Sequence, residues 1–74
     1  MINKFLDDAT RVAPSCEIIV NKSAFDRGYN VHARIKGDTS KVCHLFIKED
    51  LSDQEEVIEA IGNWYSENKV PSHG

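Results

Sequence analysis

The sequence contains no long apolar run; even its longest uninterrupted apolar stretches are no longer than Ile18–Val20. A helix that crosses a membrane needs about 20 predominantly apolar residues, so the sequence predicts no membrane span. The opening segment, Met1–Asp8, carries acids where a secretory signal would need an apolar core. We therefore expect a cytoplasmic protein with no membrane partner.

Cysteine is scarce, and neither Cys16 nor Cys43 belongs to a C-x-x-C or other metal-binding spacing. We interpret both as small apolar residues of predicted strands, and we expect no disulfide and no cofactor. His32 and His44 can be read as a metal pair, but no carboxylate or cysteine lies at a spacing that completes a site. The sequence therefore predicts no metal.

Signals of catalysis are also missing. The serines lack the context of a nucleophile elbow, and Glu17 is the one carboxylate near the segments that hold His32 and His44. A chain of 74 residues offers little concavity to shelter a reaction. We predict that the protein is not an enzyme and has no catalytic residues.

The apolar pattern predicts a single α+β domain over residues 1–68, followed by a flexible tail at 69–74. Apolar residues at helical spacing predict a first helix from Ile2 to Val12, ended by Pro14. Three strands are then expected over Cys16–Lys22, Tyr29–Lys36 and Lys41–Lys48.

A second helix is predicted before Asn68. Ser52 and Glu55 have the spacing of a capping box, with Ser52 as N-cap. Its apolar stripe consists of Val57, Ile58, Ile61, Trp64 and Tyr65. The order α-β-β-β-α with short connections favours a three-stranded antiparallel sheet with both helices packed on one face.

The register of the second and third strands decides what the other face displays, because a slip of one residue turns every side chain over. With a connection of two or four residues, Val42, His44 and Phe46 would point into the core. With a connection of three, Cys43, Leu45 and Ile47 would do so, and we prefer this register because it buries no histidine. The open face would then carry His32, Arg34, Lys36, His44, Phe46 and Lys48.

Three interpretations of that face remain open. It can be a solvated surface, whose cross-strand pairs only support the sheet. It can associate with a second copy of the chain through a strip of Ile19, Val42 and Phe46, giving a homodimer. It can also bind single-stranded nucleic acid, with Phe46 stacking on bases and the basic side chains holding phosphates.

Charge is distributed unevenly. Residues 49–67 contain seven acids and no Lys or Arg, whereas the rest of the chain holds all nine bases against five acids, for a net charge of −3. Capping explains the acids at the start of the second helix, but Glu59 and Glu67 lie beyond its first turn. The candidate partner-binding acids are Glu49, Asp50, Asp53, Glu55, Glu56 and Glu59.

The opening helix around Ile2 and Leu6, and the closing segment Ile58–Trp64 behind an acidic lead-in, give the chain a resemblance to the small acidic anti-CRISPR proteins of phages. In that family acids in the strand loops and near the last helix imitate DNA. The resemblance implies such a role for Glu49, Asp50, Asp53, Glu55 and Glu56. It suggests a DNA mimic that acts as an inhibitor and is encoded by a phage or mobile element.

The same element order belongs to the double-stranded RNA-binding domain, which needs a lysine cluster at the start of its second helix. Here that position reads Ser52-Asp53-Gln54-Glu55-Glu56, which has the opposite charge. The main hypothesis is therefore a non-catalytic binding protein that docks its acidic helix on a basic surface of a partner protein. The alternative is a nucleic-acid-binding module that uses the basic sheet face.

Overall fold

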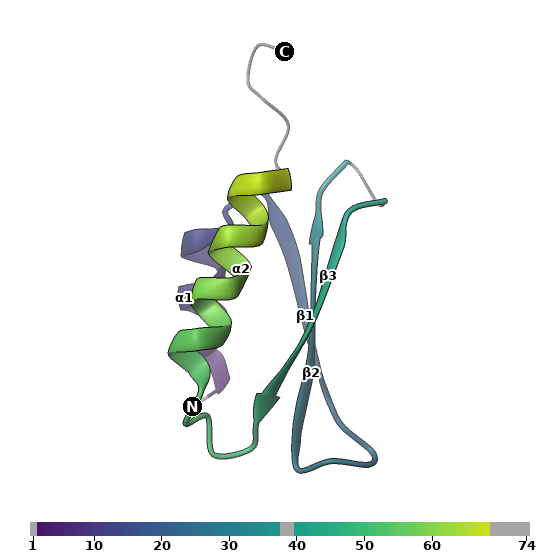
Figure 1. Cartoon of the computed structure of the whole chain (residues 1–74), viewed down its shortest axis with the longest axis vertical. Helices are drawn as coiled ribbons and strands as arrows, with labels where there is room; N and C mark the ends of the chain where they lie inside the picture. Colours follow the sequence, from purple (N-terminus) through teal and green to yellow (C-terminus); the bar gives the residue numbers. More distant parts are fainter. Residues whose placement is uncertain (1, 38–39, 69–74) are drawn as a thin grey trace.

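The computed structural model describes residues 2–37 and 40–68 and has the predicted α-β-β-β-α order (Figure 1). The elements are α1 (Ile2–Val12), β1 (Cys16–Lys22), β2 (Gly28–Ile35), β3 (Val42–Lys48) and α2 (Gln54–Asn68). The expected strand bounds differ from these by one residue at β2 and β3. The flexible tail expected at 69–74 lies outside the described residues.

The helix α1 is amphipathic and ends where the sequence predicts. Phe5 and Ala9 are buried, while Lys4, Asp8 and Arg11 lie on the opposite side. Pro14 cannot donate a backbone hydrogen bond, and the chain turns there. The turn is closed by a hydrogen bond from the Cys16 backbone NH to the Ala13 carbonyl.

The sheet is an antiparallel meander with β2 in the centre. Ala33 pairs with Cys43 and Val31 with Leu45, so Cys43, Leu45 and Ile47 lie on the core face, as the sequence analysis prefers. Val31, Ala33, Ile35 and Ile47 are buried on the core face. The alternation of β2 thus predicted its buried face correctly, while β3 keeps Ile47 in the core and leaves Val42 and Phe46 exposed.

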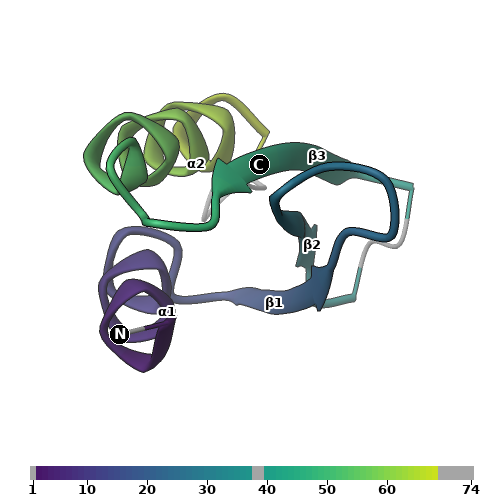
Figure 2. The same cartoon turned by 90° about the horizontal axis from the view of Figure 1, so that it is seen from below.

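Both helices lie on one face of the sheet and run in the same direction along it (Figures 1 and 2). The helix α1 packs on β1, α2 packs on β3, and the helices contact each other. The core between the layers contains Phe5, Val31, Ile47 and Ile61 as its largest fully buried side chains. The other face of the sheet is left open, as predicted.

The beginning of α2 differs from the prediction. The helix begins at Gln54, and the carbonyl of Asp53 accepts the hydrogen bond from the Val57 backbone NH. Asp53, rather than Ser52, thus occupies the N-cap position, so the predicted capping box is wrong. Trp64 on the buried side of α2 is half-buried rather than fully enclosed. Neither helix within the described residues has the length and apolar character needed to cross a membrane.

Candidate functional site

The structure divides the six candidate acids into two groups. Glu49, Asp50 and Asp53 lie in the connection between β3 and α2, so they are not on the helix where the hypothesis placed the acidic surface. Each of them has a structural partner. Glu49 Oε2 lies 3.0 Å from Lys22 Nζ, an ion pair that ties this connection to the end of β1.

The other two carboxylates of the connection accept backbone hydrogen bonds. Asp50 Oδ1 accepts from the Ser52 NH, and Asp53 Oδ1 accepts from the Lys48 NH, both at 3.0 Å. The backbone and side-chain hydrogen bonds of Ser52 lower the pKa of Asp50 below its usual value. These acids are explained by the local structure of the turn, and they do not require a partner protein.

Glu55, Glu56 and Glu59 form the second group, which we call the α2 acidic surface. All three are exposed on the side of α2 opposite to the buried Val57 and Ile61. Side chains three and four positions apart lie on adjacent turns of a helix, so Glu59 is next to both Glu55 and Glu56. Within residues 2–37 and 40–68, none of the three makes an ion pair.

The exposed side of α1 is organised differently. Asp8 lies between two bases, with its Oδ2 3.2 Å from Lys4 Nζ and its Oδ1 2.9 Å from Arg11 Nη1. These contacts, led by the hydrogen bond from Lys4, lower the pKa of Asp8. The two helices therefore present surfaces of different character: Lys4, Asp8 and Arg11 of α1 are paired, whereas the α2 acidic surface makes no ion pair within the described residues.

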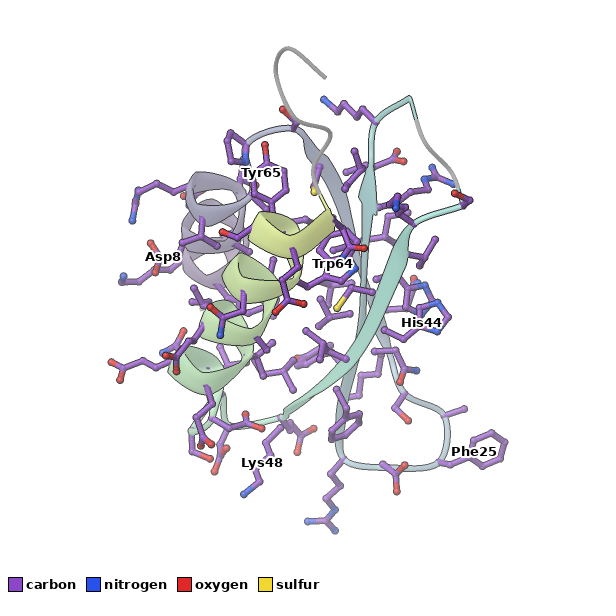
Figure 3. The ribbon with its side chains drawn as sticks, turned by 45° about the horizontal axis from the view of Figure 1, so that its top comes forward. Asp8, Phe25, His44, Lys48, Trp64 and Tyr65 are labelled. Atoms are coloured by element: carbon purple, nitrogen blue, oxygen red, sulfur yellow. The ribbon has the colours of Figure 1, made fainter. Side chains whose placement is uncertain are left out.

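The alternative site, on the open sheet face, is assembled largely as predicted. His32 and Arg34 come from β2, and His44, Phe46 and Lys48 come from β3, on the side away from the helices. Figure 3 shows His44 on that side of the sheet. Lys36 follows the last residue of β2, and its backbone NH donates to the Ser15 carbonyl, so it lies at the edge of this surface.

The open face is less basic than its sequence suggests. Arg34 is the register partner of Glu17 on β1, and the two side chains form an ion pair. The pairing joins residues 17 positions apart and could not be seen in the sequence pattern. Within the described residues, Lys36 and Lys48 make no ion pair and supply most of the remaining positive charge.

Apolar side chains are exposed on and beside the same face. Ile19, Val42 and Phe46 are 41%, 42% and 38% exposed, as the self-association hypothesis requires. Phe25, in the β1–β2 connection, is 96% exposed and points away from the protein (Figure 3). Sequence analysis missed Phe25, although an aromatic residue within the polar segment 23–28 was a signal that could have identified it.

The remaining features of the described residues are two thiols and a shallow hollow. Cys16 and Cys43 are free thiols on the two outer strands, and burial raises the pKa of each. A shallow hollow at one end of the sheet is lined by Arg27, Lys48, Glu49 and Asp50, so its walls carry both signs of charge.

Comparison of the chain with protein-family models, with curated proteins and with solved structures finds no match.

Proposed function

We propose that this protein acts by binding rather than by catalysis, and that the α2 acidic surface docks on a basic surface of a partner protein. The observation that carries the proposal is the position of Glu59, which lies one turn from both Glu55 and Glu56 and makes no ion pair within residues 2–37 and 40–68. Glu55 and Glu56 lie in the first turn, where the helix dipole stabilises them, but Glu59 lies beyond it.

This arrangement has a cost for folding. Like charges at adjacent turns of a helix destabilise it by roughly 0.2–0.5 kcal/mol per pair, and Glu59 takes part in two such pairs. A cationic partner would remove this repulsion and would gain from electrostatic attraction during the approach. A role in binding explains why the three carboxylates are grouped, whereas solubility alone would be served equally well by dispersed acids.

The partner class follows from the spacing of the charges. Successive turns of a helix are about 5.4 Å apart, so Glu55 and Glu59 present two negative charges about one turn apart along α2, with Glu56 beside them. Nucleic acid presents its phosphates in a similar way. The proposed partner is therefore a protein with a basic groove that otherwise holds nucleic acid, and the mode of action is inhibition or modulation by mimicry. The resemblance to anti-CRISPR proteins points to an accessory factor of a phage or mobile element.

The test is capture of partners from a bacterial lysate on the immobilised chain, treated with nuclease and then eluted with double-stranded DNA. A charge-reversed variant, Glu55→Lys, Glu56→Lys and Glu59→Lys, should lose the captured protein. The matched control reverses three other exposed acids, Asp7, Asp26 and Glu67, which changes the net charge equally and should retain it. Equal capture by both variants, or a captured protein that DNA does not displace, would contradict the proposal.

A second candidate function is binding of single-stranded nucleic acid on the open sheet face. It is supported by the exposure of Phe46 between the aromatic His44 and Lys48, which makes no ion pair within the described part of the chain. Stacking on an aromatic side chain is worth about 1–3 kcal/mol per base, so Phe46→Ala should weaken binding of a labelled oligonucleotide. Binding should also fall steeply with salt. Retention of an oligonucleotide by the triple α2 variant but not by Phe46→Ala would favour this function over the first.

A further inference from the structure

His32 and His44 are directly opposite each other on β2 and β3. Their rings stack, with the ring centroids 4.4 Å apart and the planes inclined by 26°. Both side chains lie on the open sheet face, where His44 is exposed and His32 is half-buried. Because the strands hold the two backbones side by side, the imidazoles are brought together by the register and not by flexible loops.

Two imidazoles held side by side are a candidate bidentate ligand. Zinc binds histidine nitrogen at about 2.0–2.1 Å, so two nitrogens on one tetrahedral ion lie roughly 3.4 Å apart. The ring centroids are 4.4 Å apart, close to this separation, and we expect rotation of the two side chains to bring one nitrogen of each ring onto a shared ion. Because the strands already hold the two backbones side by side, the conformational entropy of bringing the two ligands together is lost on folding and not on metal binding.

The surroundings permit a cation. Arg34 follows His32 by two residues on the same face of β2, but its charge is compensated by the ion pair with Glu17. The register partner of His32 on the other side is Ile19, which is apolar. Positive charge close to the imidazoles is thus largely neutralised, and the exposed side of His44 leaves room for water ligands.

The donor set selects the kind of ion. Within the described residues no group of three or more His, Cys, Asp or Glu side chains could hold a metal, so among these residues the pair has no third protein ligand. Imidazole suits zinc, copper and nickel, whereas calcium and magnesium require oxygen ligands. The sequence analysis expected no metal because it required a third ligand; a two-histidine site does not need one.

We infer that His32 and His44 bind one late first-row divalent cation as a bidentate pair on the open sheet face, with water completing the coordination. The inference is independent of the proposed function, since the α2 acidic surface lies on the other side of the protein. It assigns a specific role to the two histidines that the docking proposal leaves unused.

The test is calorimetric titration of the whole chain with zinc chloride alone. Native protein should bind a single zinc ion per chain, and calcium chloride should give no heat of binding. His32→Ala and His44→Ala should each weaken zinc binding roughly tenfold or more, because the second imidazole acts at a high effective concentration. The matched control is His73→Ala, which removes a histidine outside the pair and should leave the affinity within about twofold.

Thermal unfolding provides a second measurement that also controls for folding. Zinc should raise the Tm of the native chain and of His73→Ala, but not that of His44→Ala, because only a ligand bound to the folded state stabilises it. His44 is exposed, so its replacement by alanine should leave the fold intact in the absence of zinc. Zinc binding that survives in His44→Ala, or that is lost instead in His73→Ala or Cys43→Ser, would overturn the inference.

Discussion

The ring of Phe46 on β3 lies directly over the backbone of Gly28 at the start of β2. A Cβ atom at position 28 would collide with the Cζ atom of that ring and with the backbone oxygen of Ile47. Gly28 also has a φ of +155°, a backbone conformation that residues with a side chain rarely adopt. The contact explains how an aromatic residue on an open sheet face can remain partly covered, with 38% of its surface exposed.

We predict that Gly28→Ala lowers the free energy of unfolding by roughly 1–3 kcal/mol, through strain and displacement of the ring. Urea unfolding of Gly28→Ala, Phe46→Ala and the double variant measures the coupling between the two positions. Because Phe46→Ala removes only one of the two collisions, the substitution at position 28 should cost less, but still cost, in that background. Strictly additive effects would mean that the ring and the glycine do not interact.

Substitution of Gly62 should have the opposite effect. A Cβ atom there would lie 3.5 Å from Val12 Cβ and 3.7 Å from its Cγ2, which are ordinary contacts between α2 and α1. Alanine is favoured over glycine inside a helix by about 1 kcal/mol, so Gly62→Ala should stabilise the protein by that amount. Gly37→Ala is the contrasting control, because its φ of +88° makes the same substitution unfavourable. A lower urea midpoint for Gly62→Ala would show that the helices pack too closely for a methyl group.

Glu59→Lys should raise stability even though it is expected to impair docking. The change converts two repulsive contacts, with Glu55 and Glu56, into attractive ones, for a gain of roughly 1 kcal/mol. Glu59→Gln, which only removes the repulsion, should give about half of that gain. Thermal and urea unfolding at low salt measure the effect, and 1 M salt should reduce it. A loss of stability in Glu59→Lys would indicate that Glu59 has a folding role and would weaken the proposed function.

Acid should destabilise the protein partly through Asp8 and Asp50. Hydrogen bonds from Lys4 and from Ser52, respectively, lower the pKa of these two carboxyls below the ordinary value of 3.8. A carboxyl whose pKa is lower in the folded state contributes stability that is present above pH 3.8, and this contribution is lost as the pH falls through the folded-state pKa.

The measurement is the free energy of unfolding as a function of pH for the native chain and for Asp8→Asn with Asp50→Asn. The native protein should lose more stability than the double variant as the pH is lowered below 3.8. An NMR titration should place both folded-state pKa values below 3.8. Parallel stability curves for the two proteins would contradict the assignment.

The sequence predicted the elements well because their signals are local. Alternation in β2, helical spacing in α1 and the proline at position 14 each act within a few residues, and they identified the strands, the helix and its end. The capping prediction failed because Ser52 and Asp53 are both good N-cap residues. The path of the chain after β3 places Asp53, and not Ser52, directly before the first residue of α2. The hydrogen bond from the Lys48 backbone NH to the Asp53 carboxylate helps to fix that path.

The candidate site was predicted less completely. The sequence identified all six acids but could not separate those with internal partners from those without. Lys22, which pairs with Glu49, is 27 residues away from it along the chain. Charge composition therefore overestimates the extent of a binding surface, because some of the charged side chains form internal contacts that hold turns and strand ends together.

By itself, the sequence determined the order of helices and strands, the apolar side of each element and the separation of an acidic segment from a basic remainder. These properties follow from hydrophobic spacing and composition, which do not depend on distant contacts. Only the tertiary structure decided that Arg34 pairs with Glu17 and that His32 lies opposite His44. It also decided that Glu55, Glu56 and Glu59 make no ion pair within residues 2–37 and 40–68. Each of these depends on which strands and turns become neighbours, and that is settled by burial of the whole core rather than by any local pattern.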